Sequence, residues 1–244
     1  MHRVVLLTAL VACSIGAPGG PEHDEPADFD PVDWSPSDGK ADFAGVPATF
    51  DRNMVMSDDV LLSSGAVDAN AIQAFLEDSP YGTRSWLADY RLENQRFADV
   101  LHQIATSNGV DPVVLLARMQ VESSLVSATV KPSSSKINVA LGCGCPDASR
   151  CSSAYLGLGN QLRCATDVLT ARYADSVSGE GEWRLGHTKK TSDPLSVTPR
   201  THATASLYAY TPWVLVGRGG NWLVWNVTRK FLKHFDEAGT LHLP

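Results

Sequence analysis

Hydrophobic residues recur every three or four positions in several stretches of this chain, which is the spacing of one face of an α-helix. The first stretch brings Ile72, Phe75 and Leu76 together after Asp68, a suitable N-cap, and Pro80 ends it. Further stretches with this spacing predict helices at residues 94–109, 111–126, 152–175, 202–212 and 221–235. The pattern therefore predicts a mainly helical domain, too irregular for a simple up-and-down bundle.

The segments between these helices show weaker signals. Residues 131–150 are rich in Ser, Pro, Gly and Cys and predict a loop. Residues 176–201 look irregular, although the sequences EWRLG at 182–186 or LSVT at 195–198 could form a short hairpin. Within 152–175, Tyr155 keeps helical spacing with the following leucines, while two glycines weaken the helix.

One carboxylate breaks the apolar pattern. In the stretch LLARMQVESSLV, Leu115, Met119, Glu122 and Val126 fall within a narrow arc of the helix, so Glu122 shares the apolar face. Asp111 is a suitable N-cap for this helix, and the proline after it fits the first turn. A buried carboxyl is desolvated, which favours its protonated form and suits it to act as a general acid. The alternative is a structural glutamate bonded to buried backbone or to an arginine.

The N-terminus predicts export. A short apolar run after the basic start MHR indicates a signal peptide at residues 1–12, and it is too short to cross a bilayer. The run ends in LVAC, which resembles the bacterial lipobox, whose cysteine, here Cys13, is lipidated. Ordinary cleavage near Ala17 is the alternative. We expect a lipid-anchored envelope protein, in the outer membrane or periplasm of a Gram-negative host.

Composition separates a tether from a folded part. Residues 13–55 are acidic and rich in Pro and Gly, which predicts a disordered tether before a domain at residues 56–244. The segment 22–42 carries eight acids and one lysine, a net of −7, which equals the charge of the whole chain. The folded part is therefore nearly neutral, which argues against nucleic acid and leaves glycans open as a ligand. We expect a monomer.

Four cysteines, Cys143, Cys145, Cys151 and Cys164, crowd into one short region. In an exported chain this predicts disulfides. Four cysteines allow three pairings, and a bridge within CGC would be strained. Of the two other pairings we favour Cys145–Cys151 with Cys143–Cys164. A zinc site with four thiolates is the competing hypothesis, although it usually has two CxxC pairs. No other metal or cofactor motif is present, and His187 and His202 lack metal-pair spacing.

The sequence GVDPVVLLARMQVESSLV resembles the catalytic helix of lytic transglycosylases and goose-type lysozymes, in which an apolar helix ends in a Glu-Ser pair. ALGCGCPD stands where those proteins carry a Gly-Leu-Met-Gln loop, and ATASLYAYTP is similar to their segment facing the active site. The resemblance implies a lysozyme-like fold and catalysis by Glu122. The altered loop and the missing Asn after Tyr210 put the fit of the substrate in doubt.

The resemblance also suggests residues around Glu122. Tyr210 would face the cleft, whereas Tyr208 would point away from it, since two residues differ by about 200° on a helix. Ser123 could orient the glutamate, and Asp147 is the nearest second acid. Two polar residues could reach a sugar from the next helix, Asn160 and Gln161. Packing or surface roles are the alternative for each of them.

Tryptophans can line sugar sites, because sugar rings offer apolar faces to aromatic side chains. Trp86 and Trp213 are the better candidates for lining, whereas Trp222 and Trp225 fit the core.

The resemblance implies a peptidoglycan-cleaving glycosidase, a lytic transglycosylase or muramidase without a cofactor, acting on the β-1,4 bond between muramic acid and glucosamine. The alternatives are a glycan-binding or scaffolding envelope lipoprotein with weak or no catalysis, and a zinc-dependent hydrolase.

The lipobox makes the first prediction. Cys13→Ala removes the acceptor of the lipid, so the protein should move from the membrane fraction to the soluble exported fraction, as measured by fractionation and immunoblotting. Ser14→Ala is the neighbouring control. An unchanged need for detergent would contradict lipidation.

Overall fold

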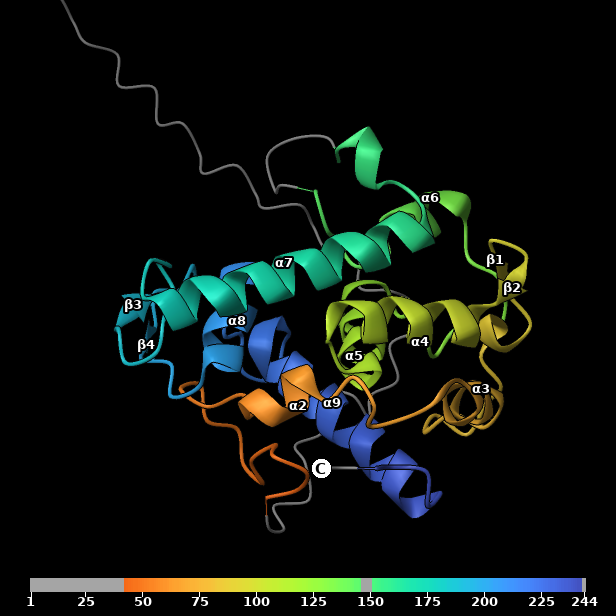
Figure 1. The fold of residues 1–244 in the computed structure, drawn as a ribbon, viewed down its shortest axis with the longest axis horizontal. Helices are drawn as coiled ribbons and strands as arrows, with labels where there is room; N and C mark the ends of the chain where they lie inside the picture. Colours follow the sequence, from red (N-terminus) through yellow and green to blue (C-terminus); the bar gives the residue numbers. More distant parts are fainter. Residues whose placement is uncertain (1–41, 146–150, 243–244) are drawn as a thin grey trace, which may run out of the picture.

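The structure is a computed structural model that describes residues 42–145 and 151–242. It is mainly helical, with two very short hairpins and two disulfides (Figure 1). The elements in chain order are α2 (Asp58–Leu62), α3 (Ala69–Glu77), η1 (Trp86–Ala88), β1 (Arg91–Leu92), β2 (Gln95–Arg96), α4 (Phe97–Asn108), α5 (Pro112–Ser123), α6 (Ser134–Asn138), η2 (Ser153–Tyr155), α7 (Leu158–Ser178), β3 (Lys189–Lys190), β4 (Ser196–Val197), α8 (His202–Tyr210) and α9 (Gly220–Glu237). The predicted helical class is therefore confirmed.

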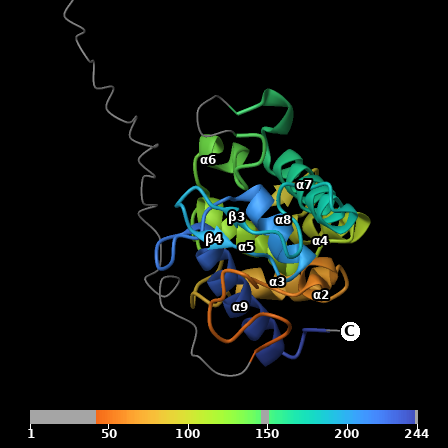
Figure 2. The ribbon, with the colours of Figure 1, turned by 90° about the vertical axis from the view of Figure 1, so that its left-hand side faces the viewer.

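Helix α5 forms the centre of the domain. Its residues are buried on nearly every side, with only Val121 and Glu122 outside the buried set. It packs against α9, α4 and α7, and α7 packs in turn against α8. Figures 1 and 2 show α7 and α9 passing on opposite sides of α5. A helix surrounded in this way needs apolar residues all round its axis, which the sequence PVVLLARMQV supplies except at Arg118 and Gln120.

Local signals set the helix ends. Asp68 caps α3 through its side chain, which accepts from the Ala71 backbone N–H at 2.7 Å. Gly109 ends α4 with a φ of 67°, a conformation that glycine adopts without a steric cost. The predicted caps of α3 and α5 and the predicted end of α4 are thus confirmed.

Several predicted boundaries were wrong. Helix α7 begins at Leu158, because Gly157 has a φ of 98° and separates it from η2, where Tyr155 is exposed. The predicted loop contains the short helix α6, which Ser133 caps. In the hairpin, Ser196–Val197 pairs with Lys189–Lys190, and EWRLG is not the partner strand.

Two more segments differ from the prediction. Helix α2 was not predicted, because five residues are too few to show a period. Helix α9 starts at Gly220, and the Asn221 side chain donates to Thr211 O and Trp213 O instead of capping it.

The segment at residues 42–55, predicted as the end of the tether, packs against the domain through Val46 and Val55, which are both fully buried. The predicted signal peptide, Cys13 and the rest of the predicted tether lie outside the described residues. Among the described helices, none combines the length and the apolar character that a bilayer span requires.

The cap of α5 has an unusual electrostatic environment. Asp111 is fully buried, and its Oδ1 accepts from the Val113 N–H at 2.7 Å. Within the described part of the chain its Oδ2 has no partner. Burial raises the pKa of Asp111 from 3.8 to about 8, so the folded state holds this proton at neutral pH.

This proton makes stability depend on pH. Between pH 4 and pH 8 the folded chain binds more protons at Asp111 than the unfolded chain, so the free energy of unfolding should fall as pH rises, by at most about 1.4 kcal/mol per pH unit. Asp111→Asn keeps a cap oxygen and should flatten this dependence in urea unfolding at pH 5 and pH 8. Asp68→Asn at the exposed cap of α3 is the control. Equal slopes for the parent and Asp111→Asn would contradict the assignment.

Candidate functional site around Glu122

Glu122 lies where α5 reaches the surface. The helix ends at Ser123, its C-cap Ser124 has a φ of 52°, and the Glu122 side chain is 28% exposed. Ser123 is buried, and its hydroxyl lies within hydrogen-bond distance of two acceptors, Met119 O at 2.8 Å and Ala140 O at 2.7 Å. Ser123 therefore joins the helix end to the following loop, and no bond from it to the Glu122 carboxylate occurs in the described structure.

A buried arginine holds the Glu122 carboxylate. Arg118 Nη2 lies 2.6 Å from Glu122 Oε1, and the Arg118 side chain has no exposed surface. The same Nη2 donates to Thr211 Oγ1 at 2.8 Å. The guanidinium carbon lies 4.1 Å from the centre of the Tyr210 ring, a cation–π distance. Arg118 thus connects α5 with the end of α8 and fixes one oxygen of Glu122 as an acceptor.

The loop opposite Glu122 approaches the other carboxylate oxygen. Gly142 has a φ of 67°, and a Cβ at this position would stand 3.4 Å from Glu122 Oε2. The Tyr210 hydroxyl donates to Leu141 O at 2.9 Å, next to this glycine. Burial raises the pKa of Tyr210 above its ordinary value of 10, so its hydroxyl keeps the proton that it donates.

Gln161 fixes the same loop from α7. It is fully buried, and its Oε1 accepts from the N–H groups of Leu141 and Cys143, each at 3.1 Å. Its Nε2 donates to Cys143 O at 2.7 Å and to Tyr155 O at 2.8 Å. Gln161 positions the loop and does not face a ligand.

Two disulfides add to this support. They join Cys143 with Cys164 and Cys145 with Cys151, the pairing that the sequence favours. Their sulfurs are therefore not available as thiolate ligands for zinc. No group of three or more His, Cys, Asp or Glu side chains in the described regions could hold a metal ion. Asp147 lies outside the described residues.

The other predicted ligand residues do not gather at Glu122. Asn160 is exposed and donates to Leu156 O at 3.0 Å. Tyr208 is fully buried and stacks on Trp183, away from Arg118. Trp86 is buried, and its indole N–H donates to Leu125 O at 3.0 Å.

Of the remaining tryptophans, Trp222 and Trp225 are buried in the core, as predicted, and Trp213 is half-buried. The structure therefore brings together Glu122 and Tyr210, with Ser123 and Gln161 as supports.

Two residues of this site were missed in the sequence. Arg118 stands four positions before Glu122, a spacing that favours an ion pair on one helix face, so a signal was present. Thr211 carries no such signal, because its role depends on where the end of α8 packs. The sequence also did not show that the backbone at Gly142 would lie beside the Glu122 carboxylate.

Comparison with known families gives one match. Residues 54–235 match the family model described as LasA, N-terminal domain. No curated protein and no solved structure matches the chain.

This match overturns the resemblance to lytic transglycosylases and goose-type lysozymes, because the matched family is not of the lysozyme-like kind. The physical reason lies in the short motif that suggested it. In this structure Ser123 fastens a helix end to a loop, and Glu122 neutralises a buried arginine. A Glu-Ser pair at the end of an apolar helix can therefore arise from packing alone.

The Arg118–Glu122 pair predicts an asymmetric stability effect. Glu122→Gln leaves Arg118 buried without a counterion and should lower the free energy of unfolding by roughly 1–3 kcal/mol, between the values for exposed and buried pairs. The second substitution Arg118→Met removes the buried charge. In urea unfolding, the double variant should therefore be more stable, by about 1 kcal/mol or more, than the sum of the two single effects predicts. The exposed pair Arg163–Glu93, at 2.7 Å, is the control cycle and should show weaker coupling. Full additivity at Arg118 and Glu122 would contradict the role of this pair.

Proposed function

We propose that this chain, which belongs to the LasA N-terminal domain family, is a peptidoglycan-binding domain that holds the glycan at Glu122 without cleaving it. LasA is the precursor of a peptidoglycan-degrading peptidase, so the family relates the chain to an enzyme of the cell wall, and not of the lytic transglycosylase type. Membership of this family supports peptidoglycan as the ligand, and the geometry of Glu122 supports binding of the glycan in place of its cleavage.

The observation that carries this proposal is the 2.6 Å contact between Arg118 and Glu122. A general acid must present an oxygen that can donate a proton to the substrate, whereas Glu122 Oε1 is occupied as the acceptor of the Arg118 guanidinium. Its second oxygen, Oε2, faces Gly142 at the edge of the loop and can accept from a ligand. Sugar hydroxyls and N-acetyl amide groups are donors of the kind that such an oxygen binds.

The rigidity of the site supports the same function. Gln161, Tyr210 and the Cys143–Cys164 disulfide all hold the loop beside Glu122. A site that is already ordered loses less entropy when a ligand binds, so a modest number of hydrogen bonds yields useful affinity.

The first pair of variants blocks Oε2 without changing any charge. Gly142→Ala puts a methyl group 3.4 Å from this oxygen, whereas Gly109→Ala meets no atom within 4 Å. Both glycines have a φ of 67°, so the two variants share the same backbone strain. Gly142→Ala should weaken binding to purified sacculi about tenfold in a co-sedimentation assay, whereas Gly109→Ala should bind like the parent. Equal binding by both variants would contradict a role for Oε2.

The second pair of variants tests Glu122 directly and separates binding from cleavage. Glu122→Gln should weaken sacculus binding about tenfold, and Glu93→Gln at the exposed pair should not, with thermal melting confirming that each variant is folded at the assay temperature. Mass spectrometry of the supernatant should find no released muropeptides with the parent. If the parent releases muropeptides and Glu122→Gln does not, the result would instead support the glycosidase hypothesis. In that hypothesis, which remains a prediction, Glu122 is the general acid/base.

The family match favours a second candidate function, in which the domain acts on a LasA-type peptidase domain. The observation behind it is that the matched region of the family is the N-terminal domain of a peptidase precursor. The measurement is the rate of wall-peptide cleavage by such a peptidase with and without this chain. A changed rate that Glu122→Gln leaves intact would support this function at a different surface.

Export and lipid anchoring at Cys13 belong to this proposal. An anchored domain with a binding site for peptidoglycan would hold the cell wall close to a membrane, as a monomer that needs no cofactor. The fractionation of Cys13→Ala tests the anchor independently of the glycan site.

A further inference from the structure

A pocket lies on the side of α8 where Tyr208 packs, away from Glu122. It has a volume of about 480 Å³ and is formed by the second half of α7, the segment 181–189 and the end of α8. None of its lining residues belongs to the Glu122 site. Its size is in the range of roughly 300–1,000 Å³ that is typical of small-molecule sites.

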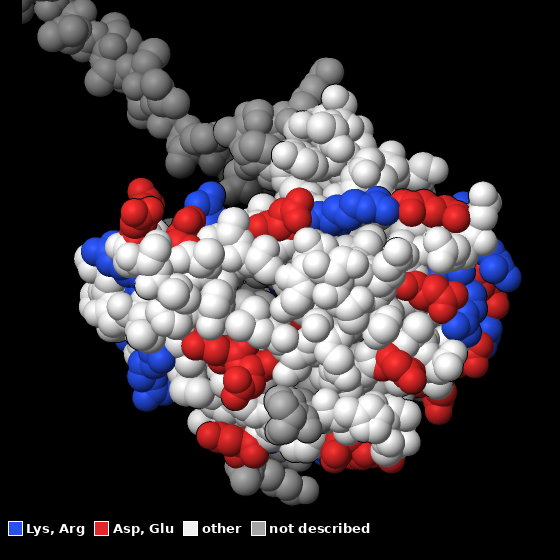
Figure 3. Space-filling view, viewed as in Figure 1, with Lys and Arg blue, Asp and Glu red and all other residues white. Residues whose placement is uncertain are grey.

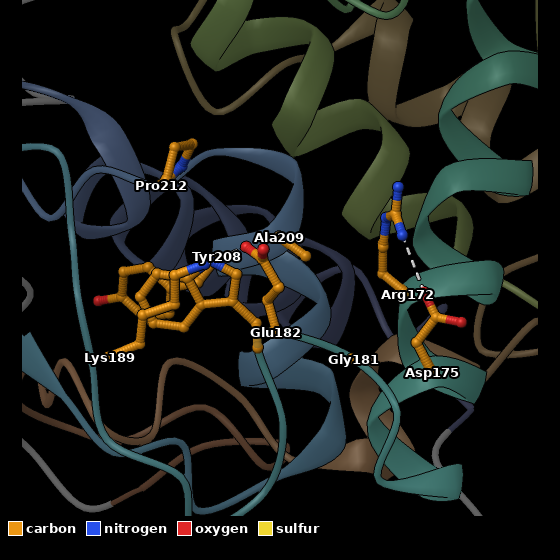
Figure 4. Close-up of a pocket in the computed structure, with 9 residues that line it drawn as sticks. Arg172, Asp175, Gly181, Glu182, Lys189, Tyr208, Ala209 and Pro212 are labelled. Atoms are coloured by element: carbon orange, nitrogen blue, oxygen red, sulfur yellow. Dashed lines mark hydrogen bonds and ion pairs between the residues drawn. The ribbon is translucent and has the colours of Figure 1, made fainter.

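The pocket has two charged walls. In Figure 4, Arg172 and Asp175 project from α7 on one side, and Glu182, Lys189 and Tyr208 lie on the other. Arg172 Nη1 lies 2.8 Å from Asp175 Oδ2, and Lys189 pairs with Glu182. Each wall therefore offers one cation and one anion, and these exposed pairs cost little to separate.

The floor of the pocket is aromatic but offers no free ring face. Trp183 stacks on Tyr208 with ring centres 5.1 Å apart, and Lys189 Nζ lies 5.4 Å from the Trp183 ring. Trp183 is only 6% exposed, so a sugar cannot lie flat on it. The Tyr208 hydroxyl is buried and has no hydrogen-bond partner among the described residues, so the charged side chains of the two walls are the polar groups that a ligand would meet.

We propose that this pocket binds a short peptide that carries both a free carboxylate and a free amine. The carboxylate would take Arg172 or Lys189 as its partner, and the ammonium would take Asp175 or Glu182. A ligand with charges of one sign only would meet a like charge on each wall, and a neutral sugar would find no ring to stack on. The stem peptides of peptidoglycan have this chemistry, and only this choice of source rests on the proposed function.

The test measures peptide binding to the full chain by isothermal titration calorimetry. The probes are the stem tripeptide L-Ala-γ-D-Glu-meso-diaminopimelate, the all-L tripeptide Ala-Glu-Lys, and forms of each with acetylated amines and amidated carboxyls. The free peptides should bind, and blocking either kind of group should weaken binding about tenfold. Tighter binding of the stem peptide would identify the ligand as a cell-wall peptide. Equal binding of the two free peptides would support a ligand with a free carboxylate and a free amine, and would contradict a cell-wall origin.

Variants assign the binding to this pocket. Arg172→Ala and Lys189→Ala should each weaken binding about fivefold to tenfold, and Arg163→Ala, on α7 but paired with Glu93, should leave it unchanged. Failure of both free peptides to bind, equal binding of the blocked forms, or an equal effect of Arg163→Ala would overturn the proposal.

The two sites can fail separately. Glycan strands freed of peptide stems probe only Glu122, so Lys189→Ala should bind them like the parent, and Gly142→Ala should still bind the peptides. If the parent chain binds the stripped glycan strands but not the free peptides, the peptide pocket alone is overturned. If the parent binds the free peptides but not the stripped strands, only the glycan site is overturned.

Discussion

The burial of one guanidinium determines how the centre of this domain is built. Arg118 sits on α5 with no exposed surface, and a charge removed from water needs a counterion and hydrogen-bond acceptors. Glu122 supplies the charge, Thr211 supplies an acceptor, and the Tyr210 ring covers the guanidinium. The end of α5 and the end of α8 must therefore meet at one place, and that place is the candidate site.

The disulfide loop is arranged around this meeting point. Gln161 satisfies three backbone groups of the loop and Tyr210 satisfies a fourth, so residues 141–143 are held by side chains in place of a regular element. Gly142 is needed because the backbone adopts a positive φ there and because the carboxylate leaves little room. The result is a partly exposed carboxylate with one oxygen fixed and one oxygen open, which suits recognition of a donor.

Helix α8 divides the molecule into two regions of different chemistry. Tyr210 faces Arg118 and the loop that carries the disulfides, whereas Tyr208 faces Trp183 and the pocket with mixed charges. On the face seen in Figure 3, acidic and basic side chains are interspersed without a broad patch of one sign. This face of the protein therefore offers local pairs of opposite charge in place of one strong field.

The amino-acid sequence alone predicts the helical class and several helix ends, because caps such as Asp68 and Asp111 and the glycine at 109 act on neighbouring backbone groups. It also determined that Tyr208 and Tyr210 must point apart, since that follows from helix geometry. The spacing of Arg118 and Glu122 was visible, but not that the arginine would be wholly buried while the glutamate would reach the surface. The packing of α8 and α9 around α5 buries Arg118 and leaves Glu122 at the surface. The same packing makes Glu122 the counterion of the buried guanidinium. Burial depends on contacts between residues far apart in the chain, such as Arg118 with Thr211, and no local pattern encodes those contacts.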